Sequence, residues 1–228
     1  AWDLRLPATD PVVLEQPAFR PYWDQPPRGP LAVPGRYTVT LAMRQAGKLV
    51  ELSEPQSFTV KPLELSPETS SDPGSVQAFK KKAGELYRAV AGAVAYSAEL
   101  NNRIAHLKSG LRDTPRATEA DEQALRALEV RLGDISVALE GDGTVASRNE
   151  PTPWSIGQRA SIVYQWLLDS QADVPGLYEA SYAIAADEFA TALRDLQAVG
   201  RDLGALEKRL ESLGTPWTPG REPGWQGD

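Results

Sequence analysis

The chain lacks cysteine entirely, and its 228 residues include only one histidine and one methionine. The absence of cysteine excludes disulfides, thiolate catalysis and zinc sites built on cysteine. No run of apolar residues approaches the roughly 20 that a membrane-spanning helix needs. We therefore expect no membrane-spanning segment, and imidazole chemistry is confined to His106.

Positive charge is scarce relative to negative charge, and the excess is unevenly distributed. The formal net charge is −7, yet residues 1–66 hold seven Lys or Arg and seven Asp or Glu, so the excess acidity lies later in the chain. Nucleic acids and anionic lipids are bound through stripes or patches of basic residues, which this sequence does not have. The composition therefore predicts no nucleic-acid partner and no membrane partner.

Proline divides the chain into regions of different composition. Twelve of the 19 prolines fall within residues 1–73 and only four within 74–213. This shift predicts a β domain over 1–65, a linker over 66–73, a helical bundle over 74–214 and a tail rich in Pro and Trp over 215–228. The chain opens without an initiator Met or a signal-peptide pattern, so we expect it to be part of a longer protein.

Short alternating stretches separated by turn residues predict β-strands in the first region. The strands are expected at 2–6, 36–43, 49–53 and 56–61. Alternate residues of the second strand share an apolar face, namely Tyr37, Val39, Leu41 and Met43. The pattern fits a small, partial immunoglobulin-like β-sandwich, which we expect to be incomplete at its N-terminus because about 65 residues are too few for a whole one.

Two long stretches of the helical region, 74–111 and 177–213, carry apolar or small residues at alternating steps of four and three. The first pattern consists of Phe79, Ala83, Leu86, Val90, Ala93, Ser97, Leu100, Ile104, Leu107 and Leu111. The second consists of Tyr178, Tyr182, Ala185, Phe189, Ala192, Leu196, Val199, Leu203, Leu206, Leu210 and Leu213. Each stretch predicts a helix roughly 55 Å long, whose apolar seam other helices must cover.

Two shorter helices are predicted between the long ones, each from a capping-box pattern in its first turn. One begins at Thr118, with Asp121 three residues on, and ends at Gly141; the other begins at Ser155, with Gln158 three residues on. We expect an antiparallel four-helix bundle with two long helices, which would return the tail to the β domain. The alternative is a three-layer bundle in which the two shorter helices are collinear, and this would leave the tail about 55 Å from the β domain.

The seams also raise the question of oligomerisation through the long helices. The connections at 113–117 and 171–176 are short, and many seam positions are Ala or Ser, which permit close packing. Both features favour closure of the bundle within one chain. We therefore expect a monomer.

No group of residues predicts catalysis, a metal site or a cofactor. His106 lies beside a seam position without an identified nucleophile and orienting carboxylate. Asp142 lies between two glycines but lacks the other ligands of a calcium loop, so this segment predicts a helix end and a turn. The helical carboxylates predict solvated faces with Lys and Arg neighbours; they include Glu119, Asp121, Glu122, Glu129, Asp187, Glu188, Asp195 and Asp202. We expect no enzymatic activity in this chain.

Six tryptophans, at positions 2, 23, 154, 166, 217 and 225, offer flat aromatic faces of the kind on which sugars stack. We expect Trp2 and Trp23 in the core of the β domain and Trp166 in the bundle. Trp217 and Trp225 lie in the tail and are the candidate residues for a ligand-binding platform. The competing expectation is that the tail packs on the β domain.

A series of motifs in the first 65 residues carries a resemblance. WDLR is followed by a Pro-rich stretch, then by PGRYTVTLAM, a Gly-containing turn and SFTVKPL. This series resembles the C-terminal Ig-like module of large secreted bacterial proteins, whose main body is a sortilin-type β-propeller with Asp-box (BNR) repeats. In that glycosyl-hydrolase-like family a helical segment follows the module. The chain departs from the family pattern at residues 63–65, LEL in place of DPR, and at 175–176, PG in place of PT.

The resemblance implies a non-catalytic structural or protein-interaction region at the C-terminus of a larger protein that is secreted, periplasmic or at the cell surface. The implied partner is the upstream β-propeller of the same protein, and another protein or a glycan is the other partner considered. The alternative function is a carbohydrate-binding accessory module that uses Trp217 and Trp225. The propeller, with any glycosidase site, lies outside this chain.

Overall fold

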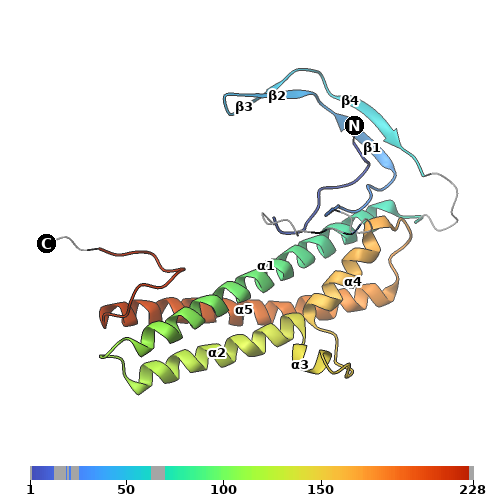
Figure 1. Ribbon diagram of the computed structural model, residues 1–228. Helices are drawn as coiled ribbons and strands as arrows, with labels where there is room; N and C mark the ends of the chain where they lie inside the picture. Colours follow the sequence, from blue (N-terminus) through green and yellow to red (C-terminus); the bar gives the residue numbers. More distant parts are fainter. Residues whose placement is uncertain (1, 13–18, 20, 22–25, 63–69, 226–228) are drawn as a thin grey trace.

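The computed structural model describes residues 2–12, 19, 21, 26–62 and 70–225. A β-hairpin region projects from a long helical body, so the fold is of the mixed α+β class (Figure 1). The strands are β1 (Gly35–Val39), β2 (Ala42–Gln45), β3 (Lys48–Glu51) and β4 (Gln56–Val60). The helices are α1 (Pro73–Arg112), α2 (Glu119–Glu140), α3 (Gly143–Ala146), α4 (Ile156–Asp169) and α5 (Gly176–Ser212).

The two long helices form where the heptad patterns predict them. At the start of α1, Asp72 accepts a hydrogen bond from the backbone N–H of Ser75 at 3.1 Å, and Pro73 occupies the first helical position. α5 ends before Gly214, whose φ of +87° is favourable only for a residue without a side chain. Most predicted seam residues of both helices are buried, and Leu100, Leu107, Val199, Leu203 and Leu210 are fully so, whereas Leu86, Tyr178, Tyr182 and Leu213 are half-buried.

α1 and α5 lie side by side and run in the same direction. The rings of Phe79 and Tyr182 are 5.5 Å apart near their first turns, and the hydroxyl groups of Thr114 and Thr215 are 2.9 Å apart beyond their last turns. Both α2 and α4 run the opposite way, and each packs against both long helices (Figure 1). The chain therefore passes along the body three times, with the second pass divided between α2 and α4.

The helices do not follow the expected up-down-up-down order; α2 and α4 follow one another in the same direction, as in the alternative, although α4 is inclined to α2 (Figure 1). α2 and α4 have 22 and 14 residues, which together nearly equal the 37 of α5. Two short helices in succession can thus cover the seam of a long helix from end to end. The segment between them contains α3, a single turn that the sequence did not predict, and Asp142 caps it by accepting the backbone N–H groups of Thr144 and Val145.

The apolar interior is divided between two groups of side chains along the body. The larger group joins α1, α2 and α5 and the first turns of α4, and Leu132 and Leu196 are among its most deeply buried members. The smaller group lies between α1, α4 and α5, where Phe79, Ala83, Val163 and Leu167 are buried. Trp166 packs against the smaller group and stacks on Tyr178 with ring centroids 4.9 Å apart, which confirms its predicted place in the bundle.

Two buried carboxylates fasten the helices to one another. Glu207 on α5 accepts two hydrogen bonds from the guanidinium of Arg103 on α1. Asp121 on α2 is only 2% exposed, and it accepts hydrogen bonds from Arg209 on α5 and from the backbone N–H and hydroxyl of Thr118. These hydrogen bonds hold the pKa of the Asp121 carboxyl well below its ordinary value.

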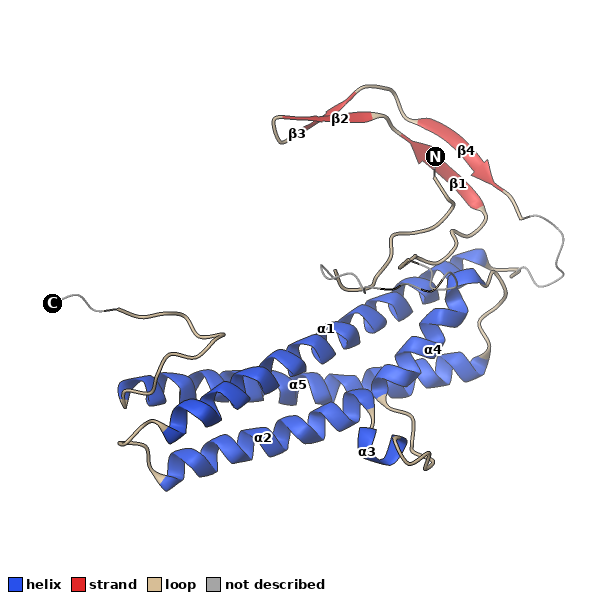
Figure 2. Cartoon of the chain, viewed as in Figure 1, coloured by secondary structure: helices blue, strands red, loops and turns tan. Residues whose placement is uncertain are grey.

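The first region is an open hairpin and contains no sandwich within the described residues. β1 pairs with β4 and β2 pairs with β3, both antiparallel, and each pair forms a two-stranded sheet (Figure 2). The expected strand at 2–6 is reduced to a single bridge between Arg5 and Leu31. Leu4 has a φ of +61°, which interrupts the extended backbone that a strand requires.

The tail does not return to the β region, contrary to the first expectation. Its buried residues Thr215, Thr218 and Arg221 lie at the far end of the body, where the methyl groups of both threonines approach Gly110 of α1. Because the chain makes three passes, α5 ends at the opposite end of the body from the hairpin (Figure 2). Among the described helices, none is both long enough and apolar enough to cross a membrane.

Replacing Asp121 by Asn is expected to lower the free energy of unfolding at pH 7 by about 2 kcal/mol, because Asn accepts fewer hydrogen bonds and carries no charge for Arg209. The folded-state pKa of Asp121 lies below its unfolded value of about 3.9, so the carboxylate contributes stability above pH 4 and loses it as the pH falls further. Urea unfolding at pH 7 and pH 3 measures both effects.

The matched control is Asp134→Asn, since Asp134 is an exposed carboxylate on the same helix. It should leave the unfolding curve almost unchanged at pH 7. Equal loss of stability in the two variants would contradict the role assigned to the buried carboxylate.

Candidate functional site

The hairpin presents the largest collection of exposed apolar side chains in the first region. Their exposed fractions range from 38% to 67%, and the residues are Val39, Leu41, Met43, Leu49, Val50, Leu52 and Phe58. We call this set the hairpin apolar surface. Leu49 and Val50 are neighbours on β3 and therefore point to opposite faces, so the tip is apolar on both sides.

A cluster of three aromatic rings stiffens the base of the hairpin. Tyr37 of β1 lies directly opposite Phe58 of β4, and the ring centroids are 6.0 Å apart. Trp2 packs on both, at 5.2 Å from Tyr37 and 6.0 Å from Phe58, yet it remains 42% exposed. Trp2 thus joins the predicted β cluster but is not enclosed by it, and Trp23 lies outside the described residues.

The backbone beside the hairpin is tied to the helical body at the end of α4. Arg5 donates hydrogen bonds to the carbonyls of Gly29 and Leu168 and forms an ion pair with Asp169. The backbone N–H of Leu31 also donates to Leu168 at 2.8 Å. Gly29 has no room for a side chain, because a Cβ there would lie 1.9 Å from the carbonyl oxygen of Leu6.

Lys80 of α1 also holds the backbone beside the hairpin against the helical body. Its side chain is 1% exposed, and its ammonium donates to the carbonyl of Leu31 at 3.0 Å. Burial and, to a lesser degree, the charge of Arg5 lower the pKa of Lys80 to about 8, while Asp169 opposes the shift. The hairpin therefore has a fixed base and a projecting tip.

The predicted tail platform is exposed, but its two tryptophans lie far from the hairpin. Trp217 is 56% exposed and lies between Thr215 and Thr218, which pack on α1, whereas Trp225 is 89% exposed and follows this packed part of the tail. Both therefore have accessible indole faces.

The other candidates from the sequence are His106 and the helical carboxylates, and within the described part of the chain they do not form a metal-binding group. His106 is half-buried on α1, and no three His, Asp or Glu side chains of the described residues are grouped to hold a metal ion. Of the helical carboxylates, Glu129 pairs with Lys108 and Asp202 with Arg131 across helices.

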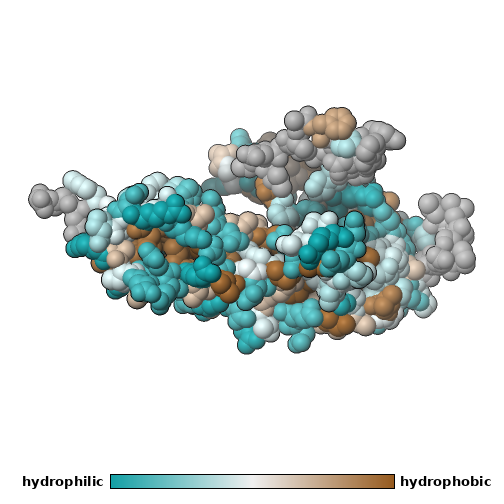
Figure 3. Space-filling view, turned by 60° about the horizontal axis from the view of Figure 1, so that its bottom comes forward, coloured by the Kyte–Doolittle hydropathy of each residue, from teal (hydrophilic) through white to brown (hydrophobic). Residues whose placement is uncertain are grey.

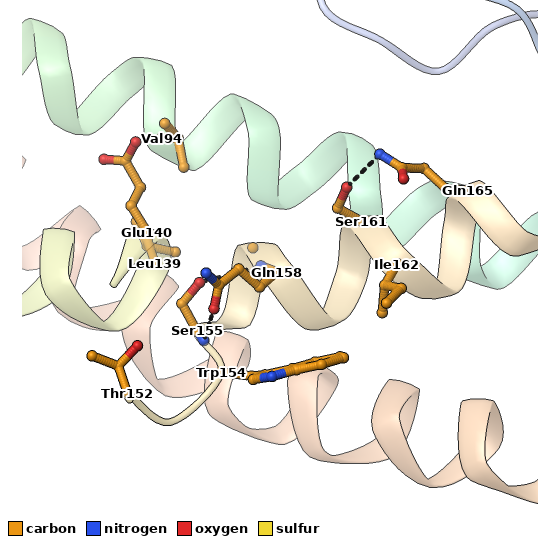
Figure 4. A pocket seen from close by; sticks show the side chains of 11 residues that line it. Val94, Leu139, Glu140, Thr152, Trp154, Ser155, Gln158, Ser161, Ile162 and Gln165 are labelled. Carbon is orange, nitrogen blue, oxygen red and sulfur yellow. Dashed lines mark hydrogen bonds between the residues drawn. The ribbon is translucent and has the colours of Figure 1, made fainter. Parts of the chain in front are cut away.

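Sequence reasoning assigned no role to Trp154, which borders three adjoining hollows on the helical body. Two of them measure about 670 and 840 Å³, and the third, between α4 and α5, measures about 480 Å³. Figure 4 shows the indole of Trp154 beside the start of α4, with Ile162 pointing toward it. On the face of the body shown in Figure 3, apolar patches lie among hydrophilic residues. The feature of the sequence that could have drawn attention to Trp154 is its position immediately before Ser155, the residue that caps the start of α4.

Comparison with known proteins identifies no relatives: no family model, no curated protein and no solved structure matches this chain.

Replacing Lys80 by Met tests the attachment of the hairpin, because the replacement changes how the free energy of unfolding depends on pH. Above pH 8 the unfolded chain holds the Lys80 proton, with a pKa near 10.4, while the folded chain releases it, so stability of the native protein rises with pH. Between pH 7.5 and 9.5 the free energy of unfolding of the native protein should rise by about 2 kcal/mol relative to Lys80→Met.

Guanidinium unfolding at a series of pH values measures this difference. The control is Lys81→Met, because Lys81 is the exposed neighbour on the same turn. Parallel pH profiles for the native chain and Lys80→Met would contradict the assignment.

Proposed function

We propose that this chain is a non-catalytic structural and protein-interaction region of a larger secreted protein, and that its hairpin apolar surface docks on a β-rich domain of that protein. The observation that carries the proposal is the exposure of seven apolar side chains on the hairpin, five of them on the two-stranded sheets and two, Leu41 and Leu52, in the connections between strands. Isolated hairpins are marginally stable in water, and exposed contiguous apolar surface marks interaction sites.

The geometry of the hairpin favours a β-rich occupant over a helix. β1 and β4 each have one strand edge without a partner in the described chain, where backbone N–H and C=O groups are free to pair with an added strand. Residues 1–66 are balanced in charge, so apolar contact and backbone pairing supply the attraction rather than opposite charge. A β-rich domain can pair its strands with these free edges and can cover the hairpin apolar surface.

The resemblance of the WDLR and PGRYTVTLAM motifs to modules of sortilin-type propeller proteins supports the same occupant, the upstream β-propeller of the parent protein. Under this proposal the helical body acts as a stiff spacer about 55 Å long, with the hairpin at one end and the tail at the other. Secretion or display at the cell surface belongs to the same proposal.

Leu41→Lys is expected to weaken docking at least tenfold, because a lysine on the hairpin apolar surface must be desolvated when the partner binds. The measurement is titration calorimetry of this chain with the β-propeller region that the proposal places upstream of it. Val130→Lys is the matched control, since Val130 is 55% exposed on α2, away from the hairpin. Absence of binding by the native chain, or equal weakening by both variants, would overturn the proposal.

A second candidate function, carbohydrate binding, is favoured by the exposure of Trp217 and Trp225. A glycan that stacks on these rings should change the intrinsic fluorescence of the native chain, and Trp217→Ala or Trp225→Ala should abolish the change. Trp154→Ala is the control because Trp154 is 50% exposed but lies on the helical body. A panel of glycans that leaves the fluorescence unchanged would exclude this function.

A further inference from the structure

A cavity lies between α4 and the first two turns of α5. The cavity there measures about 480 Å³, within the usual range for small-molecule sites. Its walls are largely apolar, formed by Trp154 from the preceding loop, Ile162 from α4, and Leu177 and Ile184 from α5. Trp154, Ile162 and Ile184 are 50%, 37% and 43% exposed, so the cavity opens to solvent.

Two polar side chains line the same cavity without partners. The Nε of Arg159 and the Oγ of Ser181 are buried, and neither has a hydrogen-bond partner in the described chain. Ser181 is only 8% exposed. A buried donor without an acceptor costs free energy that a ligand can recover. Such groups on two facing helices therefore point to an acceptor that enters from outside.

The charge of the lining residues defines the acceptor. Arg159 is the only charged residue among the described residues that line this cavity, so its guanidinium has no carboxylate there. The acidic side chains of Asp187 and Glu188 line the neighbouring 840 Å³ hollow instead. A guanidinium and a hydroxyl together match a carboxylate, whose two oxygens accept both hydrogen bonds.

We propose that this cavity binds a small organic carboxylate with an aromatic or aliphatic body. The carboxylate accepts hydrogen bonds from Arg159 and Ser181, whose side chains turn toward it on binding because their Nε and Oγ atoms are inaccessible to solvent in the structure. The body of the ligand packs between Trp154, Ile162 and Leu177. The site is independent of the proposed docking function, because it lies on the helical body and shares no residue with the hairpin apolar surface.

Titration calorimetry with 4-phenylbutanoate and with its uncharged analogue 4-phenylbutanamide tests the proposal. The native chain should bind the carboxylate saturably, and it should bind the amide at least ~10-fold more weakly, because only the carboxylate forms charge-assisted hydrogen bonds. Arg159→Gln should weaken carboxylate binding at least ~10-fold and leave amide binding nearly unchanged.

The matched control is Arg148→Gln, which removes the same charge from an arginine that is 59% exposed and paired with Glu150 outside the cavity. It should bind 4-phenylbutanoate like the native chain. Ser181→Ala should weaken binding less than Arg159→Gln, and far-ultraviolet circular dichroism establishes that each variant is folded. No saturable binding by the native chain, equal binding of acid and amide, or equal effects of the two arginine variants would each overturn the proposal.

Discussion

The requirement to cover two apolar seams, each running the length of a helix of about 40 residues, governs this structure. α1 and α5 pack along each other, and α2 and α4 fill the groove that remains between them. Leu100, Leu132, Leu196 and Leu203 are almost inaccessible to water as a result. Amphipathic helices within proteins obtain most of their stability from such burial, so neither long helix would persist in water without the two-part second pass.

Dividing the second pass between two helices has consequences for the surface. At the junction the chain leaves the helical path through α3 and re-enters it at the cap formed by Ser155 and Gln158. Trp154 lies at this re-entry point, and the hollows around it arise where two short helices meet in place of one continuous helix (Figure 4). The cavity with Arg159 and Ser181 shares Trp154 with this junction, and its other lining residues come from α4 and α5.

The three-pass topology also sets the distribution of exposed groups. The hairpin and its base are attached at the start of α1 and the end of α4 by Arg5, Lys80 and Asp169. The tail is attached at the other end, through Thr114 and Thr215. An even number of passes would bring the two ends together and bury part of the hairpin apolar surface under the tail. With three passes, the hairpin apolar surface and the tail tryptophans both remain available to partners.

Local signals in the sequence determined the helices almost to the residue, because the caps at Asp72, Thr118 and Ser155 and the spacing of apolar residues depend only on neighbours in the chain. Alternation and turn residues also predicted strands in the hairpin region, but they did not predict that Tyr37 of β1 would lie opposite Phe58 of β4. The order of the layers was not accessible from the sequence either, since equal seams satisfy two topologies, and only packing of α2 and α4 in succession on both long helices selected one. The same limit applies to the cavity beside Trp154. Arg159 and Ser181 are 22 positions apart and carry no shared pattern, and only the antiparallel packing of α4 and α5 brings the two residues to one cavity.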